Sequence, residues 1–134
     1  MASEDGTPRI LVVEDNAINQ LVTAEALEDF GFVAVVAPSG AEAIDRVRAT
    51  EYDISLMDCQ MPDMDGFETT RRIRAIEREL GRRPRPIIAL TANVVRGVRA
   101  RCTEVGMDDY ISKPIDLDLL HDTIVAHLRP DATA

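Results

Sequence analysis

The chain has almost no lysine: fourteen of its fifteen basic residues are arginine, and Lys113 is the exception. Arginine carries a broad planar fork of donors, whereas lysine carries a compact point charge on a flexible stem. A lysine in so arginine-rich a chain marks a place where a guanidinium does not fit, such as a tight site that presents one oxygen of a phosphate or carboxylate. The alternative is that Lys113 is incidental and lies on a solvated surface.

Cysteine is scarce too, and long apolar runs and an excess of positive charge are missing. Cys59 and Cys102 are far apart and match no metal or redox spacing. With no run of about eighteen apolar residues and no signal-peptide pattern, we expect a cytoplasmic protein with no membrane contact by this domain. The net charge of −9 argues against nucleic acid as a direct ligand. The one basic cluster, residues 82–85, has no interleaved aromatic residues, and we interpret it as a solvated loop.

The length of 134 residues and the apolar content of 46% predict one domain with a substantial core. We expect this domain to span residues 8–129, with residues 1–7 and 130–134 as loose termini.

Short apolar runs alternate with stretches of helical spacing along the chain. The expected strands are residues 9–14, 32–37, 54–57, 86–91 and 109–111, and the expected helices are residues 17–30, 40–49, 67–80, 93–105 and 117–128. This alternation predicts an α/β fold with a doubly wound parallel sheet. Val22 and Leu27 are expected to face the core from the first helix, and Leu117 and Leu120 from the last.

Acidic, hydroxyl and basic side chains end or directly follow these strands. They are Glu14, Asp15, Asp58, Thr91 and Lys113. Ligands of doubly wound sheets bind outside the carboxyl ends of the strands, so we expect these side chains to share one site.

The three carboxylates of this edge predict a bound cation. Carboxylates that point into one cleft repel each other unless a proton or a divalent ion is shared among them. A small set of oxygen ligands with room for water and phosphate suits Mg²⁺ better than Ca²⁺. A calcium loop at residues 63–66 is the alternative, but neither register supplies the full acidic series before the glycine.

A carboxylate beside Mg²⁺, a lysine and a hydroxyl can accept a phosphoryl group, and Asp58 on the central strand is the best candidate. Lys113 and Thr91 would stabilise the charge of the incoming group. The chain lacks both glycine-rich nucleotide-binding motifs. An enzyme that hydrolyses free phosphate esters is a weaker alternative, because Gln60 stands where the second acid of such an enzyme belongs.

Four stretches carry a resemblance to a known family. They are residues 10–16 (ILVVEDN), 57–66 (MDCQMPDMDG), 87–92 (IIALTA) and 110–114 (YISKP). Together they resemble the receiver domain of two-component response regulators, over about residues 8–129 and in the family's order. The resemblance implies a flavodoxin-like, five-stranded parallel sheet of order 2-1-3-4-5 with five helices.

The resemblance also implies roles for the residues of the site. Asp58 corresponds to the phosphoacceptor. Glu14, Asp15 and Asp58, with the backbone carbonyl of Gln60, correspond to the ligands of Mg²⁺.

Further roles concern the response to phosphate. Thr91 corresponds to the switch hydroxyl, and Tyr110 to the aromatic side chain that moves inward with it. Lys113 corresponds to the lysine that contacts the phosphoryl group, and its bond to Pro114 is implied to be cis. Gln60 and Asn93 correspond to positions that tune the phosphate lifetime.

The implied function is phosphorelay signal transduction, with a histidine kinase or a histidine phosphotransfer protein as partner. Residues 14–20 and 106–110 are similar to receivers attached to hybrid sensor histidine kinases. The alternatives are a stand-alone response regulator and a receiver-like interaction module that takes no phosphate. The isolated domain is expected to catalyse only its own phosphorylation and dephosphorylation, while its parent protein can be a histidine kinase.

Two apolar residues of the first helix point to a partner surface. Ile18 and Leu21 lie off the expected buried face and near the active edge. We expect them to dock a histidine-bearing helical partner. The alternative is that two scattered exposed apolar residues have no role.

Overall fold

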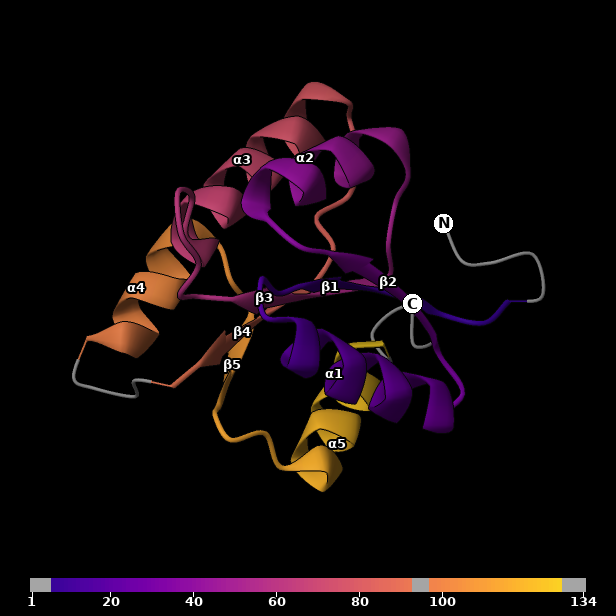
Figure 1. The fold of residues 1–134 in the computed structure, drawn as a ribbon. Coiled ribbons are helices and arrows are strands. Elements are labelled where there is room, and N and C mark those ends of the chain that lie inside the picture. The colour runs from indigo at the N-terminus through magenta and orange to yellow at the C-terminus, as the bar shows by residue number, and fades with distance from the viewer. Residues whose placement is uncertain (1–5, 93–96, 129–134) are drawn as a thin grey trace.

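The computed structural model describes residues 6–92 and 97–128, which form a central sheet between two layers of helices (Figure 1). The elements are β1 (Arg9–Val13), α1 (Ala17–Asp29), β2 (Val33–Ala37), α2 (Gly40–Ala49), β3 (Ile54–Asp58), α3 (Gly66–Glu79), β4 (Ile87–Thr91), α4 (Val98–Val105), β5 (Asp109–Ser112) and α5 (Leu117–Leu128). All neighbouring strands are parallel, and their order is β2-β1-β3-β4-β5. The predicted fold class and strand order are confirmed.

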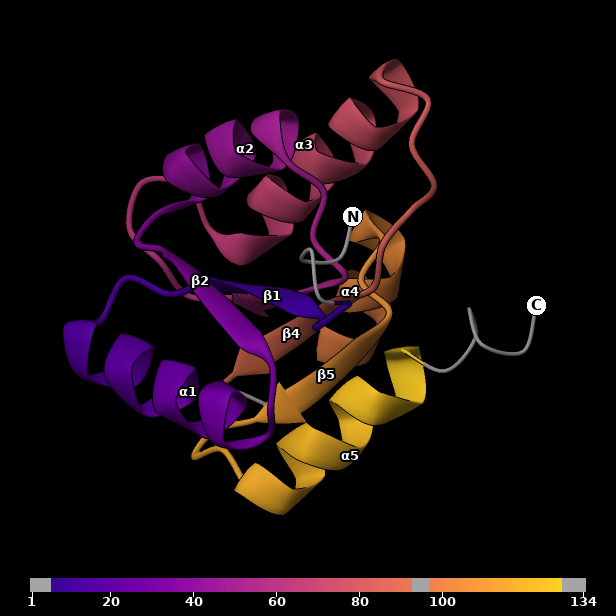
Figure 2. The ribbon, with the colours of Figure 1, turned by 90° about the vertical axis from the view of Figure 1, so that its right-hand side faces the viewer.

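The two faces of the sheet carry separate apolar cores because side chains alternate along each strand. Leu11, Val13 and Met57 face α2, α3 and α4, whereas Ile10 and Leu56 face α1 and α5. Figures 1 and 2 show α1 and α5 together on one side of the sheet, with α2 and α3 on the other. Burial on both faces explains why the central strands read as unbroken apolar runs.

Side-chain caps fix where several helices begin. The side chains of Asn16, Ser39 and Asp65 accept hydrogen bonds from backbone amides three residues later, at 2.9–3.1 Å. Asp116 accepts from the amides of Asp118 and Leu119 before α5. Because these caps satisfy amides that lack a partner in the first turn, the helix starts could be read from the sequence.

Some sequence predictions were wrong. Val22 and Leu117 were assigned to the core, but both are exposed. The buried face of α1 is formed by Thr23, Ala26 and Leu27, and each step along a helix turns by about 100°, which carries Val22 out of that face.

The helix expected at residues 93–105 is described only as α4; residues 93–96, Asn93 included, lie outside the described residues. So do residues 1–5 and 129–134, which cover most of the expected loose termini.

Residues 82–85 are not the fully solvated loop that was predicted. The guanidinium of Arg82 donates to the carbonyl oxygens of Val47 and Arg48, at the C-terminus of α2. Arg85 is half-buried and lies 3.7 Å from Glu51. The last carbonyls of a helix lack partners within it, so they attract a cation that can donate several hydrogen bonds.

Arg74 connects α3 to two segments that are distant in sequence. Its guanidinium donates to the carbonyl oxygens of Gly106 and Arg85 and forms ion pairs with Glu77 at 2.8 Å and Asp108 at 2.9 Å. The Arg74 and Glu77 side chains are only 13% and 6% exposed. The bonds from Arg74 to Gly106 and Asp108 hold α3 against the segment between α4 and β5.

No helix within residues 6–92 and 97–128 is long and apolar enough to cross a bilayer.

We predict that Arg74→Met lowers the free energy of unfolding by about 3–5 kcal/mol, because it leaves the Glu77 carboxylate buried without its partner. Chemical denaturation monitored by circular dichroism measures the change. The matched control is Arg72→Met in the same helix, whose pair with Glu68 is 3.0 Å long but 56% and 41% exposed. That variant should cost at most about 1 kcal/mol. Equal losses in the two variants would contradict the prediction.

Candidate functional site

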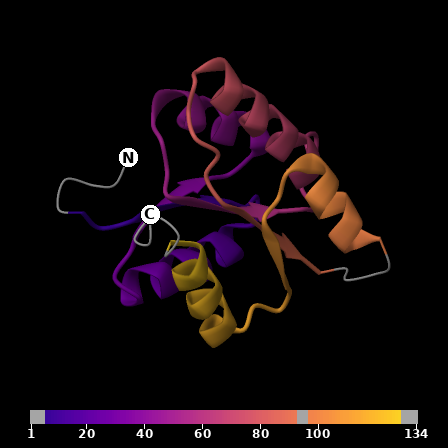
Figure 3. The same cartoon turned by 180° about the vertical axis from the view of Figure 1, so that it is seen from behind.

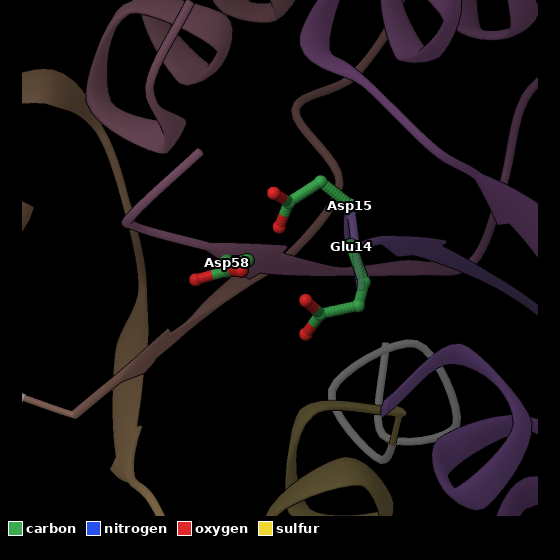
Figure 4. Close-up of side chains that lie close together, drawn as sticks. All are labelled: Glu14, Asp15 and Asp58. Carbon is green, nitrogen blue, oxygen red and sulfur yellow. The ribbon is translucent and has the colours of Figure 1, made fainter. Parts of the chain in front are cut away.

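Three carboxylates converge at the carboxyl edge of the sheet. Glu14 and Asp15 directly follow β1, and Asp58 is the last residue of β3. Their oxygens lie within 4.8 Å of one another, and Figure 4 shows the three side chains grouped at the ends of these strands. Glu14 and Asp58 are buried, whereas Asp15 is exposed. The sheet thus brings together the acidic residues that the strand ends predicted.

The single lysine reaches into this group from the loop after β5. The Lys113 Nζ lies 3.2 Å from Asp58 Oδ1 and 3.5 Å from Glu14 Oε1. Lys113 is therefore not an incidental surface residue. One ammonium faces three carboxylates, so the group keeps an excess of negative charge at neutral pH.

The backbone fixes the position of Asp58. The amide of Gln60 donates to Asp58 Oδ1 at 3.0 Å, and the amide of Cys59 donates to the Leu90 carbonyl. The first residue of α3, Gly66, passes so close that an added Cβ would lie 2.3 Å from the Asp58 carbonyl oxygen. Only glycine fits there, and this close approach keeps the loop between β3 and α3 against the site. The sequence indicated a turn at Gly66 but not this contact.

Glu14 is held by its own neighbours in the chain. The Asn16 amide donates to Glu14 Oε2 at 3.2 Å, and the Gln20 side-chain amide donates to the Glu14 carbonyl at 2.7 Å. Burial is the largest cause that raises the pKa of Glu14 above its usual range, followed by the hydrogen bond to Asp58 and the charge of Asp58. The Asn16 amide and Lys113 oppose the rise without cancelling it. Ionisation of Glu14 therefore carries a free-energy cost, which a cation bound at the site would relieve.

The donor set fits Mg²⁺. It consists of carboxylate oxygens, and the exposed Asp15 leaves the approach open to water. Glu14, Asp15 and Asp58 could each give one oxygen to a shared ion. Gln60 follows Asp58 by two residues and is exposed, but the role of its carbonyl as a further ligand stays a prediction.

Thr91 and Lys113 are connected through the backbone. Thr91 ends β4, is buried and lies in register with Ser112 of β5. The Lys113 amide donates to the Thr91 carbonyl at 2.8 Å, and the Lys113–Pro114 bond is cis, as the resemblance implied. Tyr110 lies two residues before Ser112 on β5, and its hydroxyl accepts a hydrogen bond from Arg99 at 3.1 Å. The sequence analysis did not single out Arg99.

An apolar surface lies beside the carboxylates on α1. Ile18 is 72% exposed and Leu21 61%, as expected, and Val22 adds a third side chain at 52%. Val22 also lines a groove of about 300 Å³. The other lining residues are Glu14, Asn19, Thr23, Lys113, Pro114, Ile115 and Leu117. The groove therefore runs from the apolar surface of α1 to the polar site.

Comparison with known proteins gives consistent matches. The family model for the response regulator receiver domain matches residues 10–125. The chain is 38% identical over 142 residues to probable histidine kinase 5 of Oryza sativa subsp. japonica, a match that covers 92% of this chain and 12% of that protein. Across the first curated relatives, the chain spans only 7–13% of their length.

Solved structures agree with this family match. One is the receiver domain of a sensor histidine kinase from Pseudomonas aeruginosa PAO1 with magnesium in its active-site cleft, at a TM-score of 0.82 and 38% identity, covering 91% of this chain and 98% of that chain. Another is the Saccharomyces cerevisiae receiver domain of Ssk1, crystallised with the histidine phosphotransfer protein Ypd1. It matches at a TM-score of 0.85 and 29% identity, covering 90% of this chain and 88% of that chain.

We predict that Glu14→Gln stabilises the metal-free protein at neutral pH, with a rise of about 3 °C in Tm, because it removes a charge whose burial is costly. A pKa raised by folding contributes stability that is present at low pH and lost as the pH rises through the folded-state pKa. The difference in Tm between Glu14→Gln and wild type should therefore be absent in acid and grow toward neutral pH. Thermal melts at several pH values measure it.

Mg²⁺ should make wild type more stable than Glu14→Gln. The ion binds the three wild-type carboxylates more tightly and so raises the Tm of wild type more. Glu25→Gln, an exposed change of the same chemistry on α1, is the control. A Glu14→Gln protein that is less stable than wild type without Mg²⁺ at neutral pH would refute the electrostatic account.

Proposed function

The chain belongs to the response regulator receiver domain family, and on that premise we propose that Asp58 accepts a phosphoryl group from a phosphohistidine of a partner protein. The observation that carries the proposal is the position of Asp58, whose carboxylate lies 3.2 Å from the ammonium of Lys113 and within 4.8 Å of carboxylate oxygens of Glu14 and Asp15. A carboxylate in such a setting is an oxygen nucleophile with its charge-stabilising groups already in place.

In the proposed transfer, a carboxylate oxygen of Asp58 forms a bond to phosphorus while the bond from phosphorus to the donor imidazole nitrogen breaks. The electron pair of that bond stays with the imidazole, which takes up a proton. Lys113 stabilises the negative charge of the group, and the Gln60 amide holds Asp58 Oδ1 in place. Mg²⁺ bound by Glu14, Asp15, Asp58 and the Gln60 carbonyl would neutralise charge on the phosphoryl oxygens.

We further propose that the buried Thr91 is the switch hydroxyl, which turns toward the phosphoryl group, and that Tyr110 moves inward with it. Gln60 is exposed next to Asp58, where its side chain can limit the access of water to the phosphoryl group. Asn93, the other proposed determinant of phosphate lifetime, lies outside the described residues.

We assign the chain to a phosphorelay, as the receiver part of a cytoplasmic region of a hybrid sensor histidine kinase. Its identity to the rice histidine kinase supports the origin, and the complex of the related yeast receiver with Ypd1 supports a histidine phosphotransfer protein as donor. By this proposal the receiver catalyses only its own phosphorylation and dephosphorylation. A stand-alone response regulator would use the same chemistry. A receiver-like module without phosphate is disfavoured, since Asp58, Lys113 and the acidic pair are all present.

We propose that Ile18, Leu21 and Val22 form the docking surface for the phosphohistidine-bearing partner. All three are more than half exposed, and the groove that begins at Val22 leads to Lys113. A helical partner seated there would bury apolar area next to the phosphoacceptor. Its histidine would then enter the site from the side of α1.

We predict that Mg²⁺ and acetyl phosphate add one phosphoryl mass to the chain, as measured by intact mass spectrometry. Asp58→Asn should abolish the adduct, because an amide is not a nucleophile of this kind, and chelation of Mg²⁺ should abolish it in wild type. Asp63→Asn, in the exposed loop after β3, is the control and should keep the adduct. A full adduct on Asp58→Asn would disprove the assignment of the phosphoacceptor.

A second prediction concerns the docking surface. Ile18→Asp with Leu21→Asp should slow phosphoryl transfer from a phosphorylated histidine phosphotransfer protein by about tenfold, the equivalent of about 1.4 kcal/mol of lost contact. Uptake from acetyl phosphate should be unchanged. Leu80→Asp with Leu119→Asp makes the same change in charge at two exposed residues, the C-cap of α3 and a residue of α5, and should leave transfer intact. Equal transfer rates for the two double variants would exclude this surface.

A further inference from the structure

An arginine on α4 contacts the tyrosine that we propose as a switch. Arg99 lies in the first turn of α4, which runs beside β5 at the edge of the fold (Figures 1 and 3). Its Nη2 donates to the Tyr110 hydroxyl at 3.1 Å, and its Cζ lies 5.4 Å from the centre of the Tyr110 ring. The guanidinium thus meets both the polar end and the π face of one side chain.

This double contact keeps the Tyr110 hydroxyl at the surface. The hydrogen bond is exposed, and Tyr110 as a whole is only half-buried. A cavity of about 190 Å³ lies at the same place and is lined by both Arg99 and Tyr110, together with Cys102, Thr103 and Met107. The ring therefore packs against the apolar core on one side and borders free space on another.

Tyr110 and Thr91 lie on the same face of the sheet. Tyr110 is in register with Ala89 on β4, and Thr91 follows Ala89 by two residues. Side chains in register on neighbouring strands share a face, as do residues two apart on one strand. A movement of Thr91 toward the phosphoacceptor therefore changes the surroundings of Tyr110. A movement of Tyr110 likewise changes the surroundings of Thr91.

We propose that Arg99 is a positioning residue that holds Tyr110 in its surface orientation and so opposes the phosphorylated conformation. The inference rests on the proposed function of Asp58, Thr91 and Tyr110. An inward movement of Tyr110 takes its hydroxyl away from Arg99 and breaks the double contact. Arg99 thus sets how strongly the unmodified receiver resists activation.

The size of the effect follows from linkage. Consider a ligand that binds only one of two conformations. A contact that stabilises the other conformation lowers the apparent affinity of the ligand by the factor by which it shifts the equilibrium between the conformations. An exposed cation–π contact corresponds to about a fivefold change in an equilibrium constant. Removal of Arg99 should therefore strengthen the binding of a phosphoryl analogue at Asp58 by about fivefold, although Arg99 takes no part in that site.

Arg101 is the neighbouring arginine of α4 and serves as an internal comparison. Its Cζ lies 4.1 Å from the centre of the Phe67 ring, and its Nη2 lies 3.9 Å from Asp65. These contacts tie α4 to the start of α3 and do not involve Tyr110. They remain in an Arg99 variant, so α4 keeps this attachment when the contact to Tyr110 is removed.

The test is a titration of the full chain with beryllofluoride and Mg²⁺, followed by ¹⁹F NMR of protein labelled with 3-fluorotyrosine. The chain has two tyrosines, and Tyr52→Phe assigns their signals. The buried Tyr52 reports in the same spectra that each variant is folded. The variants are Arg99→Ala, Arg99→Lys and the control Arg78→Ala, an exposed arginine of α3 that gives the same change in charge.

We expect Arg99→Ala to lower the half-saturating beryllofluoride concentration by about fivefold and to move the Tyr110 signal of the free protein toward its bound position. Arg99→Lys should lie between it and wild type, because lysine keeps the charge but not the planar fork. Arg78→Ala should match wild type. An Arg99→Ala midpoint equal to that of Arg78→Ala, or above wild type, overturns the inference alone. A wild-type chain that takes up no beryllofluoride overturns the phosphoacceptor proposal and this inference with it.

Discussion

The excess of negative charge at the carboxyl edge of the sheet is the constraint on which the site depends. Three carboxylates lie within 4.8 Å of one another, and the ammonium of Lys113 pairs with two of them, Glu14 and Asp58. Burial and the nearness of Asp58 raise the pKa of Glu14, so ionisation of Glu14 costs free energy in the metal-free protein. A divalent cation relieves this repulsion, and a phosphoryl group on Asp58 adds negative charge again. Cation binding and phosphorylation of Asp58 would therefore each change the local charge that influences the other.

Much of this arrangement could be predicted because it follows from local rules. Unbroken apolar runs marked the buried strands, and the end of each run placed Glu14, Asp58 and Thr91 at one edge of the sheet. The helix caps Ser39 and Asp116 are local in the same sense, because each bonds an amide at most three residues away. Contacts between residues distant in sequence left no local pattern from which they could be predicted. Apolar spacing placed Val22 in the core, but the packing of α1 on Thr23 and Leu27 turned it outward. The close approach of Gly66 to Asp58 depends on the path of a loop.

The scarcity of lysine has a physical counterpart in the fold. Arg74 bonds two carbonyls and two carboxylates, Arg82 bonds two carbonyls at the end of α2, and Arg101 lies over the Phe67 ring. Each contact uses the planar fork of donors or the flat face of a guanidinium, neither of which an ammonium offers. Residues 82–85 were taken for a solvated loop because such multiple contacts cannot be read from a run of like charges. Lys113 is the exception, since it meets single oxygens of Asp58 and Glu14.

These arginines also show why α4 is suited to report the state of the site. The helix has eight residues, and Gly97 at its start supplies no side-chain cap. Among the described residues, only Cys102 and Val105 of this helix are buried. Much of its attachment therefore comes from side chains at its borders: Arg99 on Tyr110, Arg101 on Phe67, and Arg74 on the carbonyl of Gly106. The exposed contacts of Arg99 and Arg101 contribute about 1 kcal/mol or less each. The proposed change of charge at Asp58, with the proposed movement of Thr91, would exceed a contact of that size but would not repack the apolar cores beneath α1 and α3. The conformational response should therefore appear first at α4 and β5.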